Sequence, residues 1–504
     1  MQTNILEYLE HAEQEFPDRI AYVCGDERIT FAELGMRAKR LGSRLCALTP
    51  PGRPIIVLSG KNLMTPVIYF GIVYAGCFYV PMSEDLPVIR MRHILEITEP
   101  EMIVTDGAHT EILDSVEHSC SILSYSQLLG EEIDTVRLNA RRRRHLGTDP
   151  LYVIFTSGSS GKPKGVVTSH QSVINYIDVF TETFNICRDD ILGNQAPLDY
   201  IAAIRDLYIP LKTGARCVFI PKSLYSTPLK LFTYLNEHRV TTLCWVAAAL
   251  SLCAELNTFD HIGLHSVNKV FFTGSVMPCK HLKVWQKNLP DSLFANHYGP
   301  TEVTASCTYH IVESLVDDTD VLPIGVPFKN MDVLLLTEEN KAPDASEIGE
   351  ICVRGVGLAL GYYGAPEKTE QSFTLNPLQP IFGERIYRTG DLGSYLPDGN
   401  LAFHGRKDFQ IKHMGHRVEL SEIEQTCLAM PEIACCQCLY KQEKEQIFLF
   451  YVGASDAKAI ATFLRSHLPA YMIPRKFIQL DALPSNFNGK PDVEAMKKMM
   501  REIL

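Results

Sequence analysis

The stretch Leu151-Tyr-Val-Ile-Phe-Thr-Ser-Gly-Ser-Ser-Gly-Lys-Pro-Lys-Gly-Val-Val-Thr-Ser-His170 indicates both the fold and the chemistry of this chain. It begins as an apolar strand, continues as a loop rich in glycine and hydroxyl groups, and becomes apolar again after two lysines. Glycines permit close backbone approach and positive φ, while hydroxyl and ammonium groups donate to anionic oxygens. The stretch therefore predicts a loop that binds the phosphates of a nucleotide. Its predicted contacts are Thr156, Ser157, Gly158, Ser159, Ser160, Gly161, Lys162 and Lys164.

The two familiar nucleotide loops do not fit this stretch. A P-loop has four residues between its glycines and a Ser or Thr directly after its lysine. Here Gly158 and Gly161 enclose two residues, and Pro163 follows Lys162. The Rossmann pattern G-x-G-x-x-G is also missing from the stretch. An ordinary Gly/Ser turn is the alternative, but the preceding strand, the four hydroxyls and the two lysines favour phosphate binding.

Length and composition indicate a multidomain globular protein. The 504 residues exceed the usual size of one hydrophobic core, and 46% of them are hydrophobic. A formal charge of −11 argues against nucleic-acid binding. The one basic run, Arg141–Arg144, is interpreted as a solvated linker, with a docking spot for an acidic partner as the alternative. The apolar region Pro66–Met82 is short for a membrane span and predicts a buried helix followed by a strand, so no span is expected.

The pattern of apolar runs predicts an α/β fold. Strand-like runs such as Pro54-Ile-Ile-Val-Leu and Asn268-Lys-Val-Phe-Phe alternate with helical stretches over the first 400 residues, which is typical of layered, largely parallel sheets. Between about 320 and 400, short strands with Gly, Pro and Asp turns predict a small β-rich subdomain. A compact α+β unit of about 100 residues is expected after Gly405.

Four further segments of the sequence are motifs that can be interpreted together with this loop. They are Asn296-His-Tyr-Gly-Pro-Thr-Glu302, Tyr387-Arg-Thr-Gly-Asp391, Gly405-Arg-Lys-Asp408-Phe-Gln-Ile-Lys running on to Gly415-His-Arg-Val-Glu419, and Leu483-Pro-Ser-Asn-Phe-Asn-Gly-Lys490. With the loop, they resemble in kind and order the motifs of the adenylate-forming enzymes. That superfamily includes acyl-CoA synthetases, beetle luciferases and the adenylation domains of nonribosomal peptide synthetases. The resemblance spans nearly the whole chain.

The resemblance implies a domain organisation and a reaction. The implied organisation is a large N-terminal domain, 1–404, which binds ATP and the acid, and a small mobile C-terminal domain, 405–504. In the family, a carboxylate attacks the α-phosphate of ATP, which yields an acyl-adenylate and pyrophosphate, and the acyl group then passes to a thiol. Positioning and charge neutralisation are therefore the tasks expected of the protein.

The resemblance also implies roles for single residues. Lys490 would be catalytic, because an ammonium group can bridge the substrate carboxylate and the α-phosphate. Lys490 is expected to leave when the small domain reorients, and a face that includes Gly415 would then line the path of the thiol. Asp408 matches the hinge. Arg417 and Glu419 are weaker candidates that could simply form a surface pair.

Nucleotide and metal contacts follow from the same motifs. Asp391 would accept hydrogen bonds from the ribose, with Arg406 near ribose or phosphate. Tyr298 would stack on adenine and Asn296 would bind its edge. The remaining two implied contacts are Thr301 at the α-phosphate and Glu302 at Mg²⁺, an ion that prefers carboxylate and phosphate oxygens.

One departure from the family concerns the acid. Registered on Gln195-Ala-Pro and Asp206, the position of the aspartate that binds a substrate ammonium is filled by Ile201. Because isoleucine cannot pair an ammonium, either the acid lacks an α-amino group or Asp199 takes over. The same register predicts a pocket lined by Ile201, Ala202, Arg205, Cys244, Phe271, Thr273, His297, Ala305 and Ser306.

Arg205 leaves two alternatives open. With His297, it could receive a second carboxylate or a polar tail of the acid. Alternatively, it could point outward and pair with Asp199 or Asp206, since neighbouring residues of a helix often form such pairs.

The chain resembles stand-alone amino-acid adenylation enzymes, such as D-alanine–carrier protein ligase, in the sequences Phe403-His-Gly-Arg-Lys and Val418-Glu-Leu-Ser-Glu. The expected function is adenylation of a small carboxylic acid and transfer to the phosphopantetheine thiol of a separate carrier protein. A synthetase that transfers the acyl group to free CoA is the alternative. A silent binding protein is a third, disfavoured because the motifs are retained. The fifteen scattered cysteines, which lack the two C-x-x-C pairs of a zinc site, together with ATP chemistry indicate a cytoplasmic location.

Overall fold

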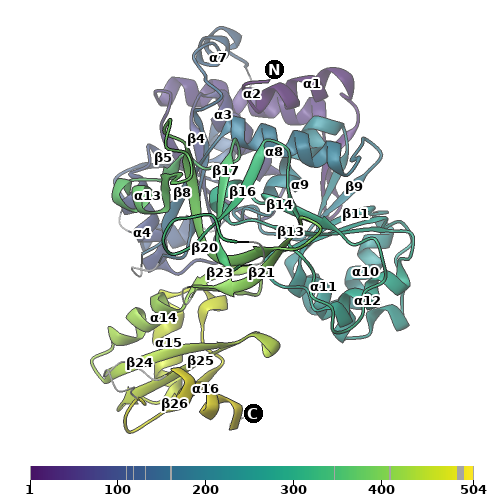
Figure 1. The fold of residues 1–504 in the computed structure, drawn as a ribbon. Helices are drawn as coiled ribbons and strands as arrows, with labels where there is room; N and C mark the ends of the chain where they lie inside the picture. The colour runs from purple at the N-terminus through teal and green to yellow at the C-terminus, as the bar shows by residue number, and fades with distance from the viewer. Residues whose placement is uncertain are drawn as a thin grey trace.

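A computed structural model describes residues 2–108, 110–116, 118–130, 132–158, 162–344, 347–407, 410–484 and 493–502. Two large sheets dominate the first 330 residues (Figure 1). The seven-stranded sheet has the order β18 (Gly361–Tyr362), β8 (Lys164–Ser169), β7 (Pro150–Thr156), β4 (Phe78–Met82), β3 (Pro54–Leu58), β5 (Met102–Thr105), β6 (Ser121–Ser124). The nine-stranded sheet has the order β15 (Val326–Pro327), β14 (Thr308–Ile311), β13 (Leu293–Tyr298), β12 (Lys269–Thr273), β11 (Thr242–Val246), β9 (Ile191–Asn194), β10 (Arg216–Phe219), β1 (Ile20–Cys24), β2 (Glu27–Thr30).

Helices separate and cover these sheets. One hydrophobic core joins the facing sides of both sheets through α1 (Leu6–Glu15), α2 (Phe31–Leu48), α3 (Met64–Tyr74), α8 (His170–Thr183) and α9 (Ala203–Thr213). The outer face of the seven-stranded sheet packs on α4 (Val88–Thr98), and that of the nine-stranded sheet on α10 (Pro228–Glu237), α11 (Ala247–Glu255) and α12 (Cys279–Asn288). Shorter helices are α5 (Thr110–Asp114), α6 (Tyr125–Leu128), α7 (Thr135–Arg142) and α13 (Pro366–Ser372). The central strands of both sheets are parallel, so the predicted layered α/β fold is confirmed.

Two of the central helices show how local sequence and position in the fold determine a helix. Helix α2 begins at a capping box, in which the Thr30 hydroxyl accepts from the Glu33 amide and the Glu33 carboxylate accepts from the Thr30 amide. Helix α3 is buried on all sides, because it lies between the two sheets. It is followed by β4, which confirms the helix and strand predicted for Pro66–Met82. Within the described part of the chain, the helices are too short or too polar to traverse a bilayer.

A third, antiparallel sheet forms the β-rich subdomain predicted between about 320 and 400. Its strands are β16 (Met331–Leu336), β17 (Gly349–Gly355), β20 (Arg385–Tyr395) and β19 (Phe373–Leu375), with β21 (Leu401–Arg406) paired to β20. Its inner side packs against the end of β13 around Tyr298 and Val303. This packing brings β20 and β21 to the edge at which the parallel strands of the nine-stranded sheet end.

The last hundred residues form a separate α+β lobe, seen at the lower left of Figure 1. It contains the hairpin β22 (Gln410–His413) and β23 (His416–Glu419), and the sheet of β24 (Ile433–Lys441), β25 (Gln446–Gly453) and β26 (Lys476–Gln479). Helices α14 (Leu420–Leu428) and α15 (Ala457–His467) cover one face of this sheet, and α16 (Val493–Glu502) covers the other. The domain boundary at 404/405 and the mobility of this lobe stay predictions.

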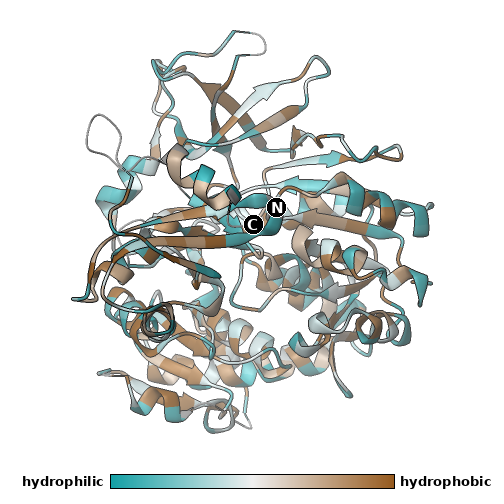
Figure 2. Ribbon diagram, turned by 90° about the horizontal axis from the view of Figure 1, so that it is seen from below, coloured by the Kyte–Doolittle hydropathy of each residue, from teal (hydrophilic) through white to brown (hydrophobic). Residues whose placement is uncertain are grey.

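Hydropathy follows these layers. In Figure 2, brown segments run mainly along strands and the inward sides of helices, and the outer loops are mostly teal. Cys436 and Cys438 of β24 are buried in the small lobe. All fifteen cysteines are free thiols.

Candidate active site

The phosphate-loop segment connects two antiparallel strands. The last register pair of β7 and β8 is Thr156 with Lys164, so residues 157–163 form the connection. A Cβ on Gly158 would lie 2.2 Å from the Lys162 carbonyl oxygen, and one on Gly165 would lie 2.7 Å from Cγ1 of Val153. Neither glycine adopts the left-handed conformation, so the contact distances, and not a positive φ, require glycine at both positions. The approach of this backbone to a phosphate stays a prediction.

The donors of this segment differ in what they contact. The buried Thr156 hydroxyl has no hydrogen-bond partner within the described ranges, and Lys162 is exposed. Ser157 donates to the Arg417 carbonyl at 2.6 Å. Lys164 points into the protein. Ser159, Ser160 and Gly161 lie outside the described residues, and so do Asp408 and Lys490.

Glu302 is the centre of a buried ionic cluster. Arg417 Nη1 lies 2.8 and 2.7 Å from its two carboxylate oxygens, and Lys164 Nζ lies 3.1 Å from Oε1. The Tyr362 hydroxyl donates to Oε1 at 2.8 Å. Burial alone would raise the pKa of Glu302, but the charges of Arg417 and Lys164 outweigh it and hold that pKa well below its ordinary value.

This cluster bears on the predicted magnesium contact. Two cationic groups already face one carboxylate, so a divalent ion at Glu302 would meet a local excess of positive charge. In this arrangement of the chain, Glu302 does not fit Mg²⁺. Among the residues that the structure describes, no cluster of three His, Cys, Asp or Glu side chains could hold a metal ion. Magnesium binding by Glu302 stays a prediction.

The predicted ribose and adenine residues meet at one place. Asp391 and Arg406 are register partners on β20 and β21, and Arg406 Nη1 pairs with Asp391 Oδ1. The Tyr298 hydroxyl donates to Asp391 Oδ2 at 2.5 Å, and Lys412 Nζ lies 5.2 Å from the centre of the Tyr298 ring. Each oxygen of a carboxylate can accept a second hydrogen bond, so Asp391 retains capacity for ribose hydroxyls.

Two other predicted nucleotide contacts lie close by on the same sheet end. Asn296 on β13 donates its amide to the Pro323 carbonyl at 2.8 Å. Thr301 is buried in the short helix η3 (Thr301–Val303). The backbone then adopts positive φ at Thr304 and Ala305, 59° and 71°, conformations that cost energy for residues other than glycine.

The predicted pocket residues share one face of the nine-stranded sheet. Cys244 on β11 is the register partner of Phe271 on β12, and Thr273 follows two residues later on the same face. His297 on β13 contacts the Phe271 ring at 5.5 Å. The rest of the predicted set, Ile201, Ala202, Ala305 and Ser306, is buried at the start of α9 and after η3.

Arg205 lies on the first turn of α9 and is 1% exposed. No ion pair joins it to Asp199, Asp206 or another described acidic residue, so the alternative of an outward ion pair is wrong. The reason is that Asp206 is turned toward Asn194, which donates to its carboxylate at 2.7 Å. Burial, with Glu84 and Asp85 nearby, raises the pKa of Asp199 to about 6.

The small lobe touches the site through its hairpin and α14. The Tyr200 hydroxyl donates to the Gly415 carbonyl, and a Cβ on Gly415 would lie 2.7 Å from Cγ1 of Val246. Arg90 of α4 and Glu422 of α14 form a buried ion pair of 2.5 Å. The interpretation of Arg417 as part of a surface pair with Glu419 is wrong, because Arg417 is directed at Glu302 instead.

Sequence reasoning missed three residues of this site. Lys412 stands in a quoted motif, which was the available signal. Tyr362 and Tyr176 contact Glu302 and the Arg205 region from β18 and α8, and no local pattern marks either of them.

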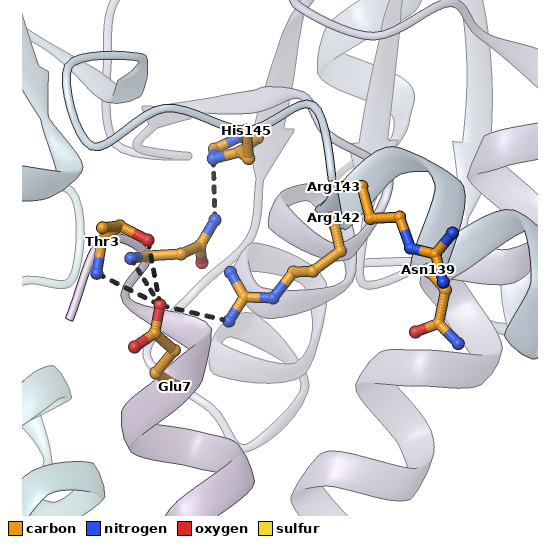
Figure 3. Close-up of a pocket in the computed structure, with 7 residues that line it drawn as sticks. Thr3, Glu7, Asn139, Arg142, Arg143 and His145 are labelled. Atoms are coloured by element: carbon orange, nitrogen blue, oxygen red, sulfur yellow. Dashed lines mark hydrogen bonds and ion pairs between the residues drawn. The ribbon is translucent and has the colours of Figure 1, made fainter. Parts of the chain in front are cut away.

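A cavity of about 540 Å³ lies elsewhere, between α1 and α7 (Figure 3). It is lined by Thr3, Asn4, Glu7, Asn139, Arg142, Arg143 and His145. Arg142 lies 3.2 Å from Glu10 and 3.8 Å from Glu7, so its charge is already paired. Arg141 and Arg142 end helix α7, which corrects the interpretation of the basic run as a linker.

Known proteins resemble this chain in sequence and in fold. The sequence model of the family described as AMP-binding enzyme matches residues 9–363. D-alanine–D-alanyl carrier protein ligase of Bacillus cereus (strain G9842) is 31% identical over 514 residues, which cover 99% of each chain. Gramicidin S synthase 1 of Brevibacillus brevis is 30% identical over 94% of this chain, which spans only 42% of that relative's length. A structure of o-succinylbenzoate CoA synthetase from Bacillus subtilis superposes with a TM-score of 0.84 at 20% identity, over 99% of this chain and 98% of the other.

Proposed function

Because the chain belongs to the AMP-binding enzymes, and is therefore an AMP-forming ligase that uses ATP, we propose that it activates a small carboxylic acid without an α-amino group. The acyl group would then pass to the phosphopantetheine thiol of a separate carrier protein. The similarity to a carrier-protein ligase along the full length of both chains supports the acceptor.

The observation that carries the choice of acid is the charge of the pocket. Ile201 cannot pair an ammonium group, and Arg205 adds a buried positive charge one helical turn away. A substrate ammonium would be repelled by this guanidinium and would find no carboxylate at the Ile201 position to compensate it. An acid without an α-amino group avoids both costs.

We assign the predicted site residues separate roles in the reaction. Asp391, Tyr298 and Arg406 would hold the nucleotide, and Thr156 and Lys162 would contact its phosphates. Lys490 would bridge the attacking carboxylate and the α-phosphate. The hairpin around Gly415 lies against Tyr200 and Val246, which supports its proposed place on the path of the thiol in the second step.

An acyl-CoA synthetase is the second candidate. The superposition on a CoA synthetase over nearly the whole of both chains favours it. The two candidates share the adenylation step and differ only in the thiol.

The test has two stages. Acid-dependent exchange of pyrophosphate into ATP is first measured with alanine, valine and aspartate, and with propionate, isovalerate and succinate as partners without the amino group. We expect exchange with acids of the second set. Exchange confined to the amino acids would contradict the proposal. Adenylate formed from an active acid is then offered holo-carrier protein or CoA, and faster transfer to CoA would select the second candidate.

A further inference from the structure

We propose that Arg205 is a receptor for a second carboxylate, so that the acid activated by this enzyme is a short dicarboxylic acid. The inference rests on the proposed function and names the substrate class of the same pocket. The reacting carboxylate would face the nucleotide, and the far carboxylate would bind the guanidinium.

Arg205 is a buried cation that forms no ion pair with the described residues. The Nε and Nη1 atoms of Arg205 are buried and have no hydrogen-bond partner among the residues described. A guanidinium does not lose its proton in proteins, and an isolated buried charge costs several kcal/mol. A neutral tail of the acid could accept hydrogen bonds but would leave the charge uncompensated. A carboxylate would accept the hydrogen bonds and also compensate the charge.

Nearby carboxylates of the protein do not fill this role. Asp206 is the next residue of α9, and successive helical residues point about 100° apart, so its side chain diverges from that of Arg205. Its Oδ2 accepts from Asn194, so its attraction to Arg205 acts at a distance and without an ion-pair contact. Asp199 has no ion-pair partner within the described ranges, and the charges acting on it most strongly belong to Glu84, Asp85 and Lys222.

Further buried polar atoms without hydrogen-bond partners surround Arg205. They are the Tyr176 hydroxyl, the Ser306 hydroxyl and both ring nitrogens of His297, all buried and without partners in the described part of the chain. Burial raises the pKa of Tyr176, and the charge of Arg205 and polar contacts with Ser306 and Arg205 that fall short of hydrogen-bond geometry oppose that rise. Burial and the charge of Arg205 hold the pKa of His297 well below its ordinary value, so its ring is neutral.

These groups match a carboxylate. Its two oxygens accept about four hydrogen bonds, and the guanidinium, two hydroxyls and one imidazole N–H can supply that number. They come from α8, α9, β13 and the loop after η3.

Aromatic rings pack against Arg205 and His297. The Arg205 guanidinium lies 5.9 Å from the centre of the Phe180 ring. Four phenylalanines, Phe180, Phe184, Phe271 and Phe328, surround His297 at 5.2 to 5.7 Å between ring centres. Such a weakly polar environment strengthens an ion pair.

The experiment compares matched acids in pyrophosphate exchange. Succinate, glutarate, adipate and phthalate are tested against their half-amides, which have nearly the same shape but carry no second charge. We expect kcat/KM for at least one diacid to exceed that of its half-amide tenfold or more. Equal values for every pair would overturn the inference and leave the proposed function standing. Absence of exchange with every acid, including monoacids and amino acids, would instead refute the proposed function.

Variants separate recognition from folding. Arg205→Met should abolish the preference for the diacid while monoacids such as butyrate remain substrates or improve. Arg205→Lys should retain part of the preference. The matched control is Arg142→Met, which removes an arginine paired with Glu10 and should leave the ratio of diacid to half-amide unchanged. An equal loss for all acids in Arg205→Met would contradict a role in recognition.

Binding of the acid is also measured without ATP, as a shift in the melting temperature of the protein. The active diacid, or succinate to phthalate in turn if none is active, should raise the melting temperature of the wild-type protein more than its half-amide does. Arg205→Lys should reduce this shift and Arg205→Met should abolish it. A shift that is the same in wild type and both variants would overturn the assignment of Arg205.

Discussion

Replacing Arg417 by methionine tests whether the Glu302 cluster holds the hairpin of the small lobe against the rest of the protein. Arg417 is on β23, and its guanidinium contacts both oxygens of the fully buried Glu302. Methionine keeps most of the apolar length of the side chain and removes the charge. In this arrangement the hairpin lies beside Val246 and Tyr200, where we place the path of the thiol.

The size of the effect follows from what Glu302 retains. Removing one partner of a buried ion pair typically costs about 3–5 kcal/mol when the other charge is left bare. Here Lys164 stays 3.1 Å away and Tyr362 keeps its hydrogen bond. The loss should therefore be closer to that of one hydrogen bond to a charged group, about 1.5–3 kcal/mol. This free energy corresponds to a decrease of about 10- to 150-fold in the population of the arrangement.

The assay separates the two half-reactions. Transfer of the acyl group from preformed adenylate to holo-carrier or CoA should slow by about 10- to 150-fold in single turnover. Pyrophosphate exchange should fall much less. Arg354→Met is the control, because Arg354 pairs with Asp332 and Glu384 on the surface of β17. Equal loss in both half-reactions, or unchanged transfer, would refute the reasoning.

Three further substitutions test other parts of the site. Lys490→Ala should nearly abolish pyrophosphate exchange while transfer from supplied adenylate survives, and equal loss of both steps would argue against its assigned role. Gly158→Ala should raise KM for ATP and destabilise the protein by about 1–3 kcal/mol, since its Cβ would overlap the Lys162 carbonyl, and unchanged ATP kinetics and melting temperature would argue against this contact. Burial raises the pKa of Asp206 to about 6, so its protonated form adds about 3 kcal/mol of stability below pH 4, which is lost as the pH rises through 6. Asp206→Asn should flatten this dependence in urea unfolding at pH 4 and pH 7, and the same slope in both proteins would show that another group is responsible.

Local patterns predicted the layered part of the fold because each strand is a short apolar run with its own boundaries. The run Asn268 to Phe272 and the observed β12 differ by one residue at each end. The order of the strands in each sheet could not be predicted from the sequence, because it depends on which apolar faces pack together. β9 lies between β10 and β11 although it precedes both in the chain.

The candidate site, like the fold, could be predicted from the sequence only in part. The partners of Asp391 could be anticipated from motifs, and Tyr298 and Arg406 do meet it. The environment of Arg205 could not, because helical spacing allows an outward pair with Asp206 as readily as a buried position. Only the packing of α8 and α9 on the sheet decides between them.

The contact between Gly415 and Val246 makes strand β11 a shared structural element. Cys244 belongs to the predicted acid pocket, and Val246, two residues later on the same face of the strand, limits how closely the hairpin of the small lobe can approach. A bulkier residue at position 246 would act as a wedge under Gly415 while also changing the volume beside Thr273. Selection or engineering for a new acid on this strand would therefore also change the geometry of acyl transfer.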